Sequence, residues 1–364
     1  MAKTIISRGQ GVLTGAGDAS ELLQAGFTQK AFRQWLQQYP RHLSADTFAS
    51  YIKNSVDSVI PVVSNATADI KTSPLDRLSS GNNLIELYRE TNNETYKTAF
   101  EALRTSIDLQ SRNVEGGLWY YTYANWSYLD GMASFAPFYT LYSSLYDEEN
   151  TAAVPDDLVL QLHLLWTHCY NNVSGLLVHG YDESYTAVWA DNVTGASPHV
   201  WGRSLGWYAM AMIDTLELLN SKTYAAAHER IKLRFNDLAS ALVQAVDSTT
   251  GAWWQILDQP GREGNYIESS GSAMFAYSLL KGARLGYLPK SVINIAKRGY
   301  EYIVDEFVVN NGNGTLGYNG TVAVCSLNST ATYEYYVGRP ILYNSVLGSA
   351  AFVLASLEYE ALEI

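Results

Sequence analysis

Apolar residues recur at three- and four-residue intervals along most of the chain, a spacing typical of amphipathic helices. The pattern predicts helices over the ranges 19–38, 44–63, 76–91, 94–110, 129–146, 156–171, 201–219, 223–247, 267–286, 289–307 and 345–361. Alternating patterns typical of strands are short and scattered. The chain is therefore predicted to be all-α.

A similar loop follows several of the predicted helix pairs. Each copy places Asn, Asp or Gly at the expected helix end, then a glycine, then an apolar or aromatic stretch. The copies are Asn113-Val-Glu-Gly-Gly-Leu-Trp-Tyr-Tyr121, Asn171-Asn-Val-Ser-Gly-Leu-Leu-Val-His179, Asp247-Ser-Thr-Thr-Gly-Ala-Trp-Trp-Gln255 and Asn310-Asn-Gly-Asn-Gly-Thr-Leu-Gly-Tyr318. The glycine predicts a left-handed cap at the helix end, which turns the chain into a rim loop. Stacked helix pairs of this kind can close into a toroid of inner and outer helices, with an open solenoid as the alternative.

The composition indicates one globular domain covering residues 1–364. Apolar residues make up 47% of the chain and charged residues 16%, which is enough apolar surface to bury a core. No linker or low-complexity tract divides the sequence. No apolar run is long enough for a membrane helix, and we expect a monomer.

The charge and the aromatic content point to a class of ligand. A formal net charge of −12 argues against nucleic acid and anionic membranes as partners. The 27 Tyr and 9 Trp residues favour a carbohydrate, because sugar-binding clefts use amphipathic rings. A small acidic sugar remains compatible with the charge if an arginine sets the local potential inside a cleft.

Asp130 is the strongest candidate for an acid. It follows an aromatic stretch that includes Trp119, Tyr120 and Tyr128, and it precedes a helix that is apolar on all faces. Aromatic surroundings raise the pKa of a carboxyl group, as a proton donor requires. The competing interpretation is a helix N-cap, which Asp also favours.

A second candidate cluster begins at His179 and ends in a helix that starts near Trp201. Arg203 and Trp207 are four residues apart on that helix, so they share a face where the arginine can hold a carboxylate and the ring can stack on a sugar. A surface cation–π pair is the alternative. His179 alone is more often structural than catalytic.

Two further acidic residues precede predicted helices. Asp76 is interpreted by default as a helix cap. Glu268 is either a second acid or a residue that complements the helix dipole, and we prefer the latter. The sequence contains no phosphate loop, zinc helix or nucleophile elbow, so we expect no metal and no cofactor.

The cysteines and the asparagines bear on the compartment. A single bridge between Cys169 and Cys325 is possible. Sequons for N-glycosylation begin at Asn65, Asn93, Asn125, Asn172, Asn192, Asn313, Asn319 and Asn328. They favour a secreted protein, with a cytoplasmic one as the alternative. Asn125 and Asn192 lie close to the candidate site in the sequence, and we expect no glycan there.

Read together, these stretches resemble glycoside hydrolase family 105, the unsaturated rhamnogalacturonyl hydrolases, and more distantly the unsaturated glucuronyl hydrolases of family 88. The segments that carry the resemblance are Leu129-Asp-Gly131, His179-Gly-Tyr-Asp-Glu-Ser184, Ala187-Val-Trp-Ala-Asp191, Thr194-Gly-Ala-Ser-Pro198, Trp201-Gly-Arg-Ser-Leu-Gly-Trp-Tyr208 and Gly264-Asn-Tyr-Ile-Glu268. The resemblance implies a six-fold (α/α)6 toroid and a metal-free reaction on a terminal 4,5-unsaturated uronic acid.

In the reaction that the resemblance implies, one acid protonates C4 of the double bond and then, as a carboxylate, helps water to add at C5. Asp130 matches the position of that acid. Asp76 matches a carboxylate that contacts sugar hydroxyls, and Arg203 matches a residue that meets the uronate. The matching pocket-lining positions are His179, Trp201 and Trp207.

The chain departs from the family pattern at two pocket positions. Tyr128 stands where the family usually has Trp, and Tyr120 stands where many relatives have His. These differences bear on which sugar is bound beyond the scissile bond more than on the reaction itself. Two other functions stay open: an inverting hydrolase of saturated glycans, with Asp76 as second carboxylate, and a sugar-binding protein without catalysis.

Overall fold

The computed structural model describes residues 1–16, 19–147 and 153–362. Helices dominate this part of the chain. They are α1 (Ala2–Ser7), α2 (Glu21–Gln38), α3 (Ala45–Val59), α4 (Ala66–Thr72), the 3-10 helix η1 (Leu75–Ser80), α5 (Gly81–Thr91), α6 (Glu94–Leu109), α7 (Met132–Tyr146), α8 (Ala153–Cys169), α9 (Gly202–Leu218), α10 (Ala225–Gln244), α11 (Ser269–Arg284), α12 (Ser291–Phe307), α13 (Tyr333–Val337) and α14 (Val346–Ala361).

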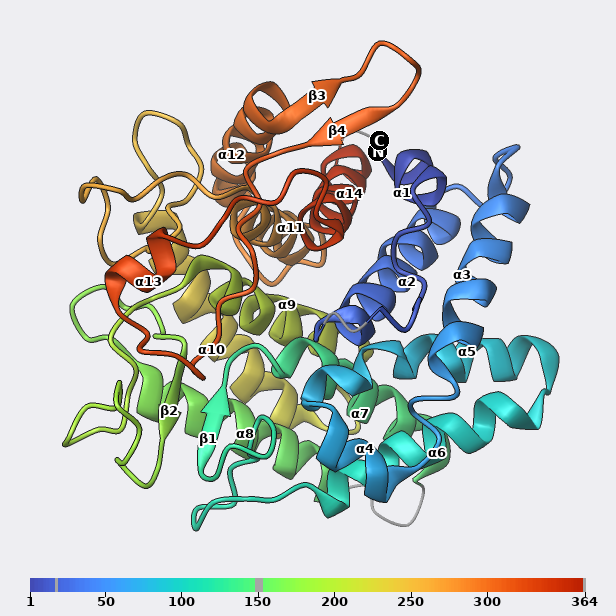
Figure 1. Ribbon diagram of the computed structural model, residues 1–364, viewed down its shortest axis with the longest axis horizontal. Helices are drawn as coiled ribbons and strands as arrows, with labels where there is room; N and C mark the ends of the chain where they lie inside the picture. The colour runs from blue at the N-terminus through green and yellow to red at the C-terminus, as the bar shows by residue number, and fades with distance from the viewer. Residues whose placement is uncertain (17–18, 148–152, 363–364) are drawn as a thin grey trace.

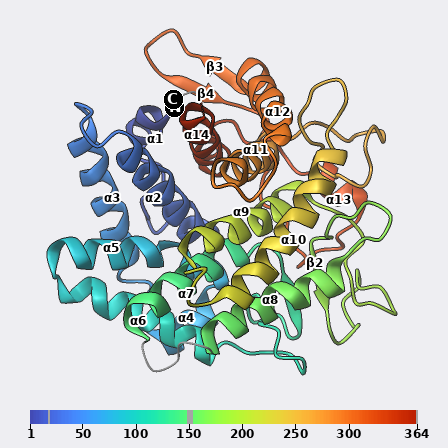
Figure 2. The ribbon, with the colours of Figure 1, turned by 180° about the vertical axis from the view of Figure 1, so that it is seen from behind.

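The inner helices form a ring. Contacts run from α2 to η1, then through α7, α9 and α11 to α14, and α14 packs back against α2. The outer helices follow the same order around the ring. Helix α3 packs on α2, α6 on α5, α8 on α7, α10 on α9 and α12 on α11, and α1 packs on α14. Figure 1 shows this ring from one end, and Figure 2 shows it from the other. The predicted α/α toroid is confirmed.

Burial explains which helices are inner and which are outer. Every residue from Gly202 to Leu216 of α9 is buried, and α11 and α14 are buried along nearly their whole length. In contrast, α12 buries one stripe that includes Val292, Ala296 and Ile303. A helix with apolar residues on all sides needs neighbours on all sides, so it takes an inner place.

The predicted helix ranges agree with the structure to within a few residues at each end. Three short helices, α1, α4 and α13, were not predicted, because five to seven residues give too few turns for a helical period to emerge. The range 76–91 divides into η1 and α5 at Gly81, where a Cβ atom would collide with the ring of Phe138.

The rim loops contain the turns that the repeated glycines predict, although the turns are placed differently. Gly116, Gly175, Gly251 and Gly314 all have φ between +72° and +87°. Each glycine lies several residues beyond its helix or strand, within a tight turn, so the expectation of a helix cap is wrong. In all four loops a side chain before the glycine helps to close the turn: Asn113, Asn171, Asp247 and Asn310 each accept a hydrogen bond from the backbone N–H two residues later.

The short strands lie in the same rim. Strand β1 (Trp126–Tyr128) pairs antiparallel with β2 (Gly180–Asp182), and β3 (Val308–Asn310) pairs with β4 (Leu316–Tyr318). The first pair sets Tyr128 opposite Gly180, and the N–H of Leu129 donates to the carbonyl of His179. This pairing brings residues fifty positions apart to one place.

The apolar core has two parts. The larger part fills the space between inner and outer helices, and the smaller one lies beneath the rim loops and includes Tyr128, Trp189, Trp201 and Tyr336. Within the described residues, no helix is long and apolar enough to span a membrane. Cys169 and Cys325 are both buried free thiols, so the possible bridge between them is not formed.

Candidate active site

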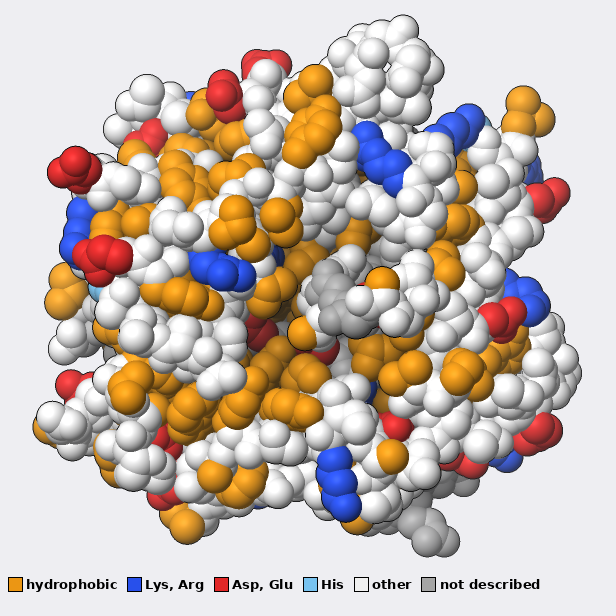
Figure 3. All heavy atoms as spheres, viewed as in Figure 1, with side chains coloured by type: hydrophobic (Ala, Val, Ile, Leu, Met, Phe, Trp, Pro, Cys, Tyr) orange, Lys and Arg blue, Asp and Glu red, His pale blue; other side chains and the backbone are white. Residues whose placement is uncertain are grey.

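A cavity of about 300 Å³ opens at the rim end of the toroid. Its wall includes seven of the eight residues expected from the sequence: Asp76, Tyr120, Tyr128, Asp130, Trp201, Arg203 and Trp207. A cavity of this size suits a small ligand. In the space-filling view, a hollow near the centre of this face contains acidic side chains among apolar ones (Figure 3).

Asp130 lies in this wall directly before α7. Gly131 occupies the N-cap position, and no side chain in the described part of the chain caps the helix, so the capping interpretation of Asp130 is wrong. The carboxylate instead accepts a hydrogen bond at Oδ2 from the hydroxyl of Ser204. Only 11% of its side chain is exposed, on the side of the cavity.

His179 lies behind Asp130 and is completely buried. Its Nε2 atom is 3.1 Å from Oδ2 of Asp130, and its Nδ1 atom is 2.7 Å from the hydroxyl of Tyr336. The resemblance placed His179 in the lining of the pocket. The structure places it one layer deeper, where it contacts the acid and not the cavity.

Asp76 is the second carboxylate in the wall. It lies within η1 and does not cap a helix, which corrects the default interpretation. The hydroxyl of Tyr120 donates to its Oδ2 at 2.8 Å, whereas Oδ1 has no hydrogen-bond partner among the described residues. Burial raises the pKa of Asp76 to about 7, the hydrogen bond from Tyr120 opposes that rise, and the nearby charge of Asp130 adds to it.

Aromatic rings form one side of the cavity. The rings of Tyr120 and Tyr128 stack with centroids 4.3 Å apart and an interplanar angle of 10°. Tyr123 continues the stack beyond Tyr128. Such flat apolar surfaces can pack against the face of a sugar ring.

Arg203 contributes positive charge to the wall, but its hydrogen-bond donors are engaged within the protein. Its two terminal nitrogens donate to the carbonyls of Val322 and Ala323 and to the hydroxyl of Ser270. The guanidinium also lies 4.8 Å from the ring centroid of Trp201. The face-sharing partner expected from the sequence, Trp207, instead packs edge-on against Phe27.

Glu268 is held as a helix cap. It is 1% exposed and accepts hydrogen bonds from the backbone N–H groups of Gly271 and Val322. One of its oxygens is 3.9 Å from Arg203. The preferred interpretation was a first-turn residue that complements the helix dipole. The structure instead places Glu268 one position earlier, at the N-cap, where its side chain caps α11.

The direction of the inner helices adds to the electrostatics of the site. Leu22 and Leu23 in the first turn of α2, Asp76 in η1 and Leu347 in the first turn of α14 all line the cavity. Helix α7 begins two residues after Asp130, and α9 begins directly after Trp201. The partial positive charges of several helix N-termini therefore converge on the cavity.

Two functional candidates escaped the sequence analysis. Ser204 lies inside the segment Trp201-Gly-Arg-Ser-Leu-Gly-Trp-Tyr208, but a single serine in a helix gives no signal of its own in the sequence. Tyr336 is 157 residues from its partner His179 and belongs to a five-residue helix. No group of three or more His, Cys, Asp or Glu side chains in the described parts of the chain could hold a metal ion.

Comparison with known proteins assigns the family. The model of Glycosyl Hydrolase Family 88 matches residues 24–363. The chain belongs to this family. It is a glycoside hydrolase.

Among solved structures, a family 105 glycoside hydrolase from C. acetobutylicum is 32% identical, covers 99% of this chain and 98% of its own, and superimposes with a TM-score of 0.87. The unsaturated glucuronyl hydrolase from Bacillus sp. GL1 shares the fold, with a TM-score of 0.65, 13% identity and coverage of 96% and 88%. Protein Atu3128 of Agrobacterium fabrum is 33% identical over 197 residues, which are 51% of this chain and 83% of that protein. The predicted resemblance to families 105 and 88 is confirmed.

Proposed function

We propose that this hydrolase removes a terminal 4,5-unsaturated uronic acid from pectin-derived oligosaccharides of the rhamnogalacturonan type. The observation that carries the proposal is the state of Asp130. Its carboxylate does not cap a helix and accepts a hydrogen bond from Ser204 on one oxygen. It also lines a cavity whose wall includes the stacked rings of Tyr120 and Tyr128. The similarity to a family 105 hydrolase over nearly the whole chain supports the proposal.

The mechanism needs one residue that acts first as an acid and then as a base. Protonated Asp130 gives its proton to C4 of the sugar, and the C4=C5 double bond is lost. Asp130, now a carboxylate, removes a proton from the water that bonds to C5, and it is protonated again. The resulting hemiketal opens and releases the aglycone, so one water is consumed in each turnover.

An acidic sugar is compatible with the electrostatics of the cavity despite the net charge of the chain. The N-termini of the inner helices direct positive partial charge toward the bound ligand. Arg203 lies in the same wall, where Glu268 is its counter-charge and its hydrogen bonds go to carbonyls of the protein. At mildly acidic pH, Asp76 is largely protonated and repels a uronate less, because its pKa is about 7.

An assay on unsaturated disaccharides tests the proposal. The substrates carry rhamnose, galacturonate or hexosamine next to the scissile bond, and the loss of ultraviolet absorbance reports the loss of the double bond. We expect turnover, fastest with rhamnose. Release of reducing sugar from saturated pectin with no change in absorbance would instead support the inverting hydrolase, and binding without turnover would support the sugar-binding protein.

The variant Asp130→Asn keeps the size of the side chain and removes its acid–base chemistry. We expect kcat to fall by about a thousandfold or more, because general acid–base catalysis contributes roughly 10²–10⁴, while substrate binding is retained. The matched control is Asp305→Asn on the exposed side of α12, which is expected to keep wild-type turnover. Equal turnover in the two variants would rule out Asp130 as the acid.

We also propose that the protein acts outside the cell. Seven of the eight sequon asparagines are exposed, and Asn125 is half-buried with φ of +66°. Production in a eukaryotic secretory host, followed by endoglycosidase treatment and mass spectrometry, tests whether glycans are attached. A chain that carries no glycan at any sequon would contradict the proposal.

A further inference from the structure

Tyr336 lies outside the cavity wall and reaches Asp130 through His179. It belongs to α13, in the rim segment between β4 and α14, and it is completely buried. Its hydroxyl is 2.7 Å from Nδ1 of His179, whose other nitrogen faces Oδ2 of Asp130 at 3.1 Å. The three side chains form a line that ends at the cavity.

The direction of the first hydrogen bond follows from the inventory of donors and acceptors. Burial raises the pKa of Tyr336 well above its ordinary value, so the phenol keeps its single proton. Among the described residues, His179 is the one hydrogen-bond partner of that hydroxyl. The hydroxyl therefore donates to Nδ1, and a neutral imidazole that accepts at Nδ1 carries its own hydrogen on Nε2.

This tautomer makes His179 a donor toward Asp130. Its Nε2–H faces Oδ2, the same oxygen that accepts from Ser204. The contact between Nε2 and Oδ2 is not yet aligned as a hydrogen bond, which is common in active sites before substrate binds. Two donors thus converge on Oδ2, while Oδ1 receives no hydrogen bond from the described residues and is left for the cavity.

We propose that Tyr336 is a positioning residue that sets the tautomer of His179 and thereby reserves Oδ1 of Asp130 for proton exchange with the substrate. This inference rests on the proposed function. If the imidazole carried its hydrogen on Nδ1, a bare Nε2 would face the carboxylate, and two lone pairs would oppose each other. The acid would then turn away from its working orientation.

Tyr336→Phe removes the hydroxyl and keeps the ring. We expect kcat on the unsaturated disaccharide to fall by about tenfold or more with KM nearly unchanged, because a wrong tautomer misplaces the acid without touching the sugar. The matched control is Tyr333→Phe in the same helix. Tyr333 also loses a hydrogen bond, to the carbonyls of Arg262 and Glu263, but it does not contact His179. Equal kcat in the two variants would overturn the inference.

A double mutant separates positioning from a general structural effect. His179→Gln is expected to lower kcat, and adding Tyr336→Phe is expected to cause no further loss, since Tyr336 acts only through His179. Losses that multiply would show that the two residues act independently, contrary to the inference.

Nitrogen-15 NMR of the wild-type imidazole tests the tautomer without any substrate. A signal from His179 with its hydrogen on Nε2, which shifts or broadens in Tyr336→Phe, supports the inference. A hydrogen on Nδ1 in the wild type overturns it, even if the enzyme is fully active. An enzyme that has the expected tautomer but no turnover on unsaturated sugars would instead contradict the proposed function.

Discussion

Asp76 is a carboxylate whose ionisation is tied to the folded state. Its pKa of about 7 lies above the ordinary value of 3.8, chiefly because burial disfavours the charge. The folded protein therefore holds this proton more tightly than the unfolded chain does. The resulting stabilisation is fully present below about pH 4 and is lost as the pH rises through 7.

Replacement by asparagine should remove this pH dependence. The rise in the pKa of Asp76 from 3.8 to about 7 corresponds to roughly 4 kcal/mol. Asn cannot ionise, but its side-chain oxygen can still accept a hydrogen bond from Tyr120. We expect the free energy of unfolding of Asp76→Asn, compared with that of the wild type, to be higher at pH 8 than at pH 4. Urea unfolding at both pH values measures this, and a difference that does not vary with pH would contradict it. Asp305→Asn, at an exposed site, is the control.

Single residues were predictable where their chemistry is visible in neighbouring positions. Asp130 was identified because aromatic residues adjoin it in the sequence. The cap interpretation failed for both Asp130 and Asp76, since an aspartate before a helix looks the same in sequence whether its carboxylate turns back to the backbone or away. The support that His179 receives from Tyr336 depends on a contact between distant segments, which no local pattern reveals.

At the scale of the element, the start of α11 depends on Glu268. This buried carboxylate satisfies an N–H of the first turn, an N–H of the segment that follows β4, and the hydroxyl of Ser270. It also lies near the buried charge of Arg203. One side chain thus joins α9, α11 and the last rim segment.

Glu268→Ala should therefore be strongly destabilising. It leaves buried donors without an acceptor and a buried guanidinium without its counter-charge, and we expect a loss of about 3–5 kcal/mol in the free energy of unfolding. Thermal and urea unfolding measure the loss. Glu334→Ala, at an exposed site on α13, is expected to change stability by less than about 0.5 kcal/mol. Similar losses in both variants would contradict this account of Glu268.

Elements were predictable wherever a helical period extends over several turns, and this covers all the long helices. Strands β1 and β2 were not predicted, because three residues in each strand give no alternation to detect. Their pairing nevertheless decides the site, since it joins the segment of Asp130 to that of His179. The part of the fold that the sequence hides is thus the rim, where short segments are held by tertiary contacts.

At the scale of the whole molecule, charged side chains connect the inner helices at the end far from the cavity. Asp214 of α9 accepts from Lys281 of α11 and from Tyr277, and it pairs with Lys30 of α2. Burial alone would raise the pKa of Asp214, but the two lysines outweigh it and hold the pKa at about 2. The network spans the ring from its first inner helix to its fourth and fifth.

Asp214→Asn should weaken the closure of the ring. The buried ammonium group of Lys281 and the partly exposed one of Lys30 lose their shared counter-charge, and we expect a loss of about 3–5 kcal/mol in the free energy of unfolding. Asp237→Asn is the control, because its pair with Arg234 is exposed and is worth less than about 1 kcal/mol. Urea unfolding of both variants measures the difference, and equal midpoints would show that the network does not hold the ring.

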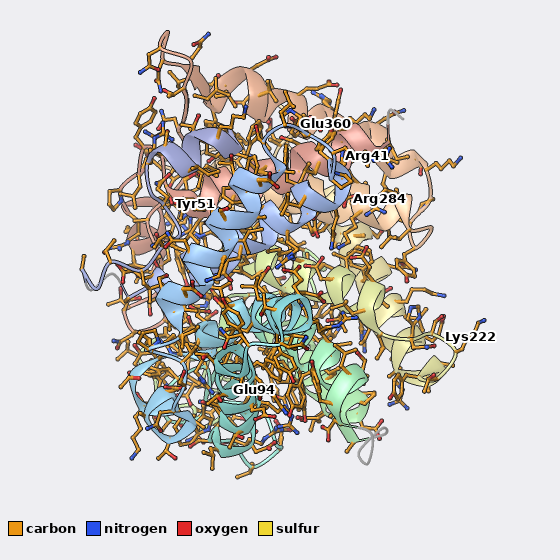
Figure 4. The ribbon with its side chains drawn as sticks, turned by 90° about the vertical axis from the view of Figure 1, so that its right-hand side faces the viewer. Arg41, Tyr51, Glu94, Lys222, Arg284 and Glu360 are labelled. Carbon is orange, nitrogen blue, oxygen red and sulfur yellow. The ribbon has the colours of Figure 1, made fainter. Side chains whose placement is uncertain are left out.

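A second set of contacts holds the seam where the ring closes. Glu358 of α14 accepts two hydrogen bonds from Arg284 of α11 and one from Gln34 of α2. In the side view, Arg284 and Lys222, in the turn after α9, lie on the same side of the molecule (Figure 4). The repeat in the sequence predicted the toroid, but which side chains close it was not predictable, because the partners come from opposite ends of the chain.

The closed ring has a consequence for the order of events during synthesis. Leu22 and Leu23, near the beginning of the chain, share the wall of one cavity with Leu347, near its end. The ribosome synthesises these two segments at widely separated times, and the helix pairs between them can stack before α14 emerges. The wall of the cavity is therefore complete only when α14 packs against α2, so the binding pocket depends on the closure of the ring.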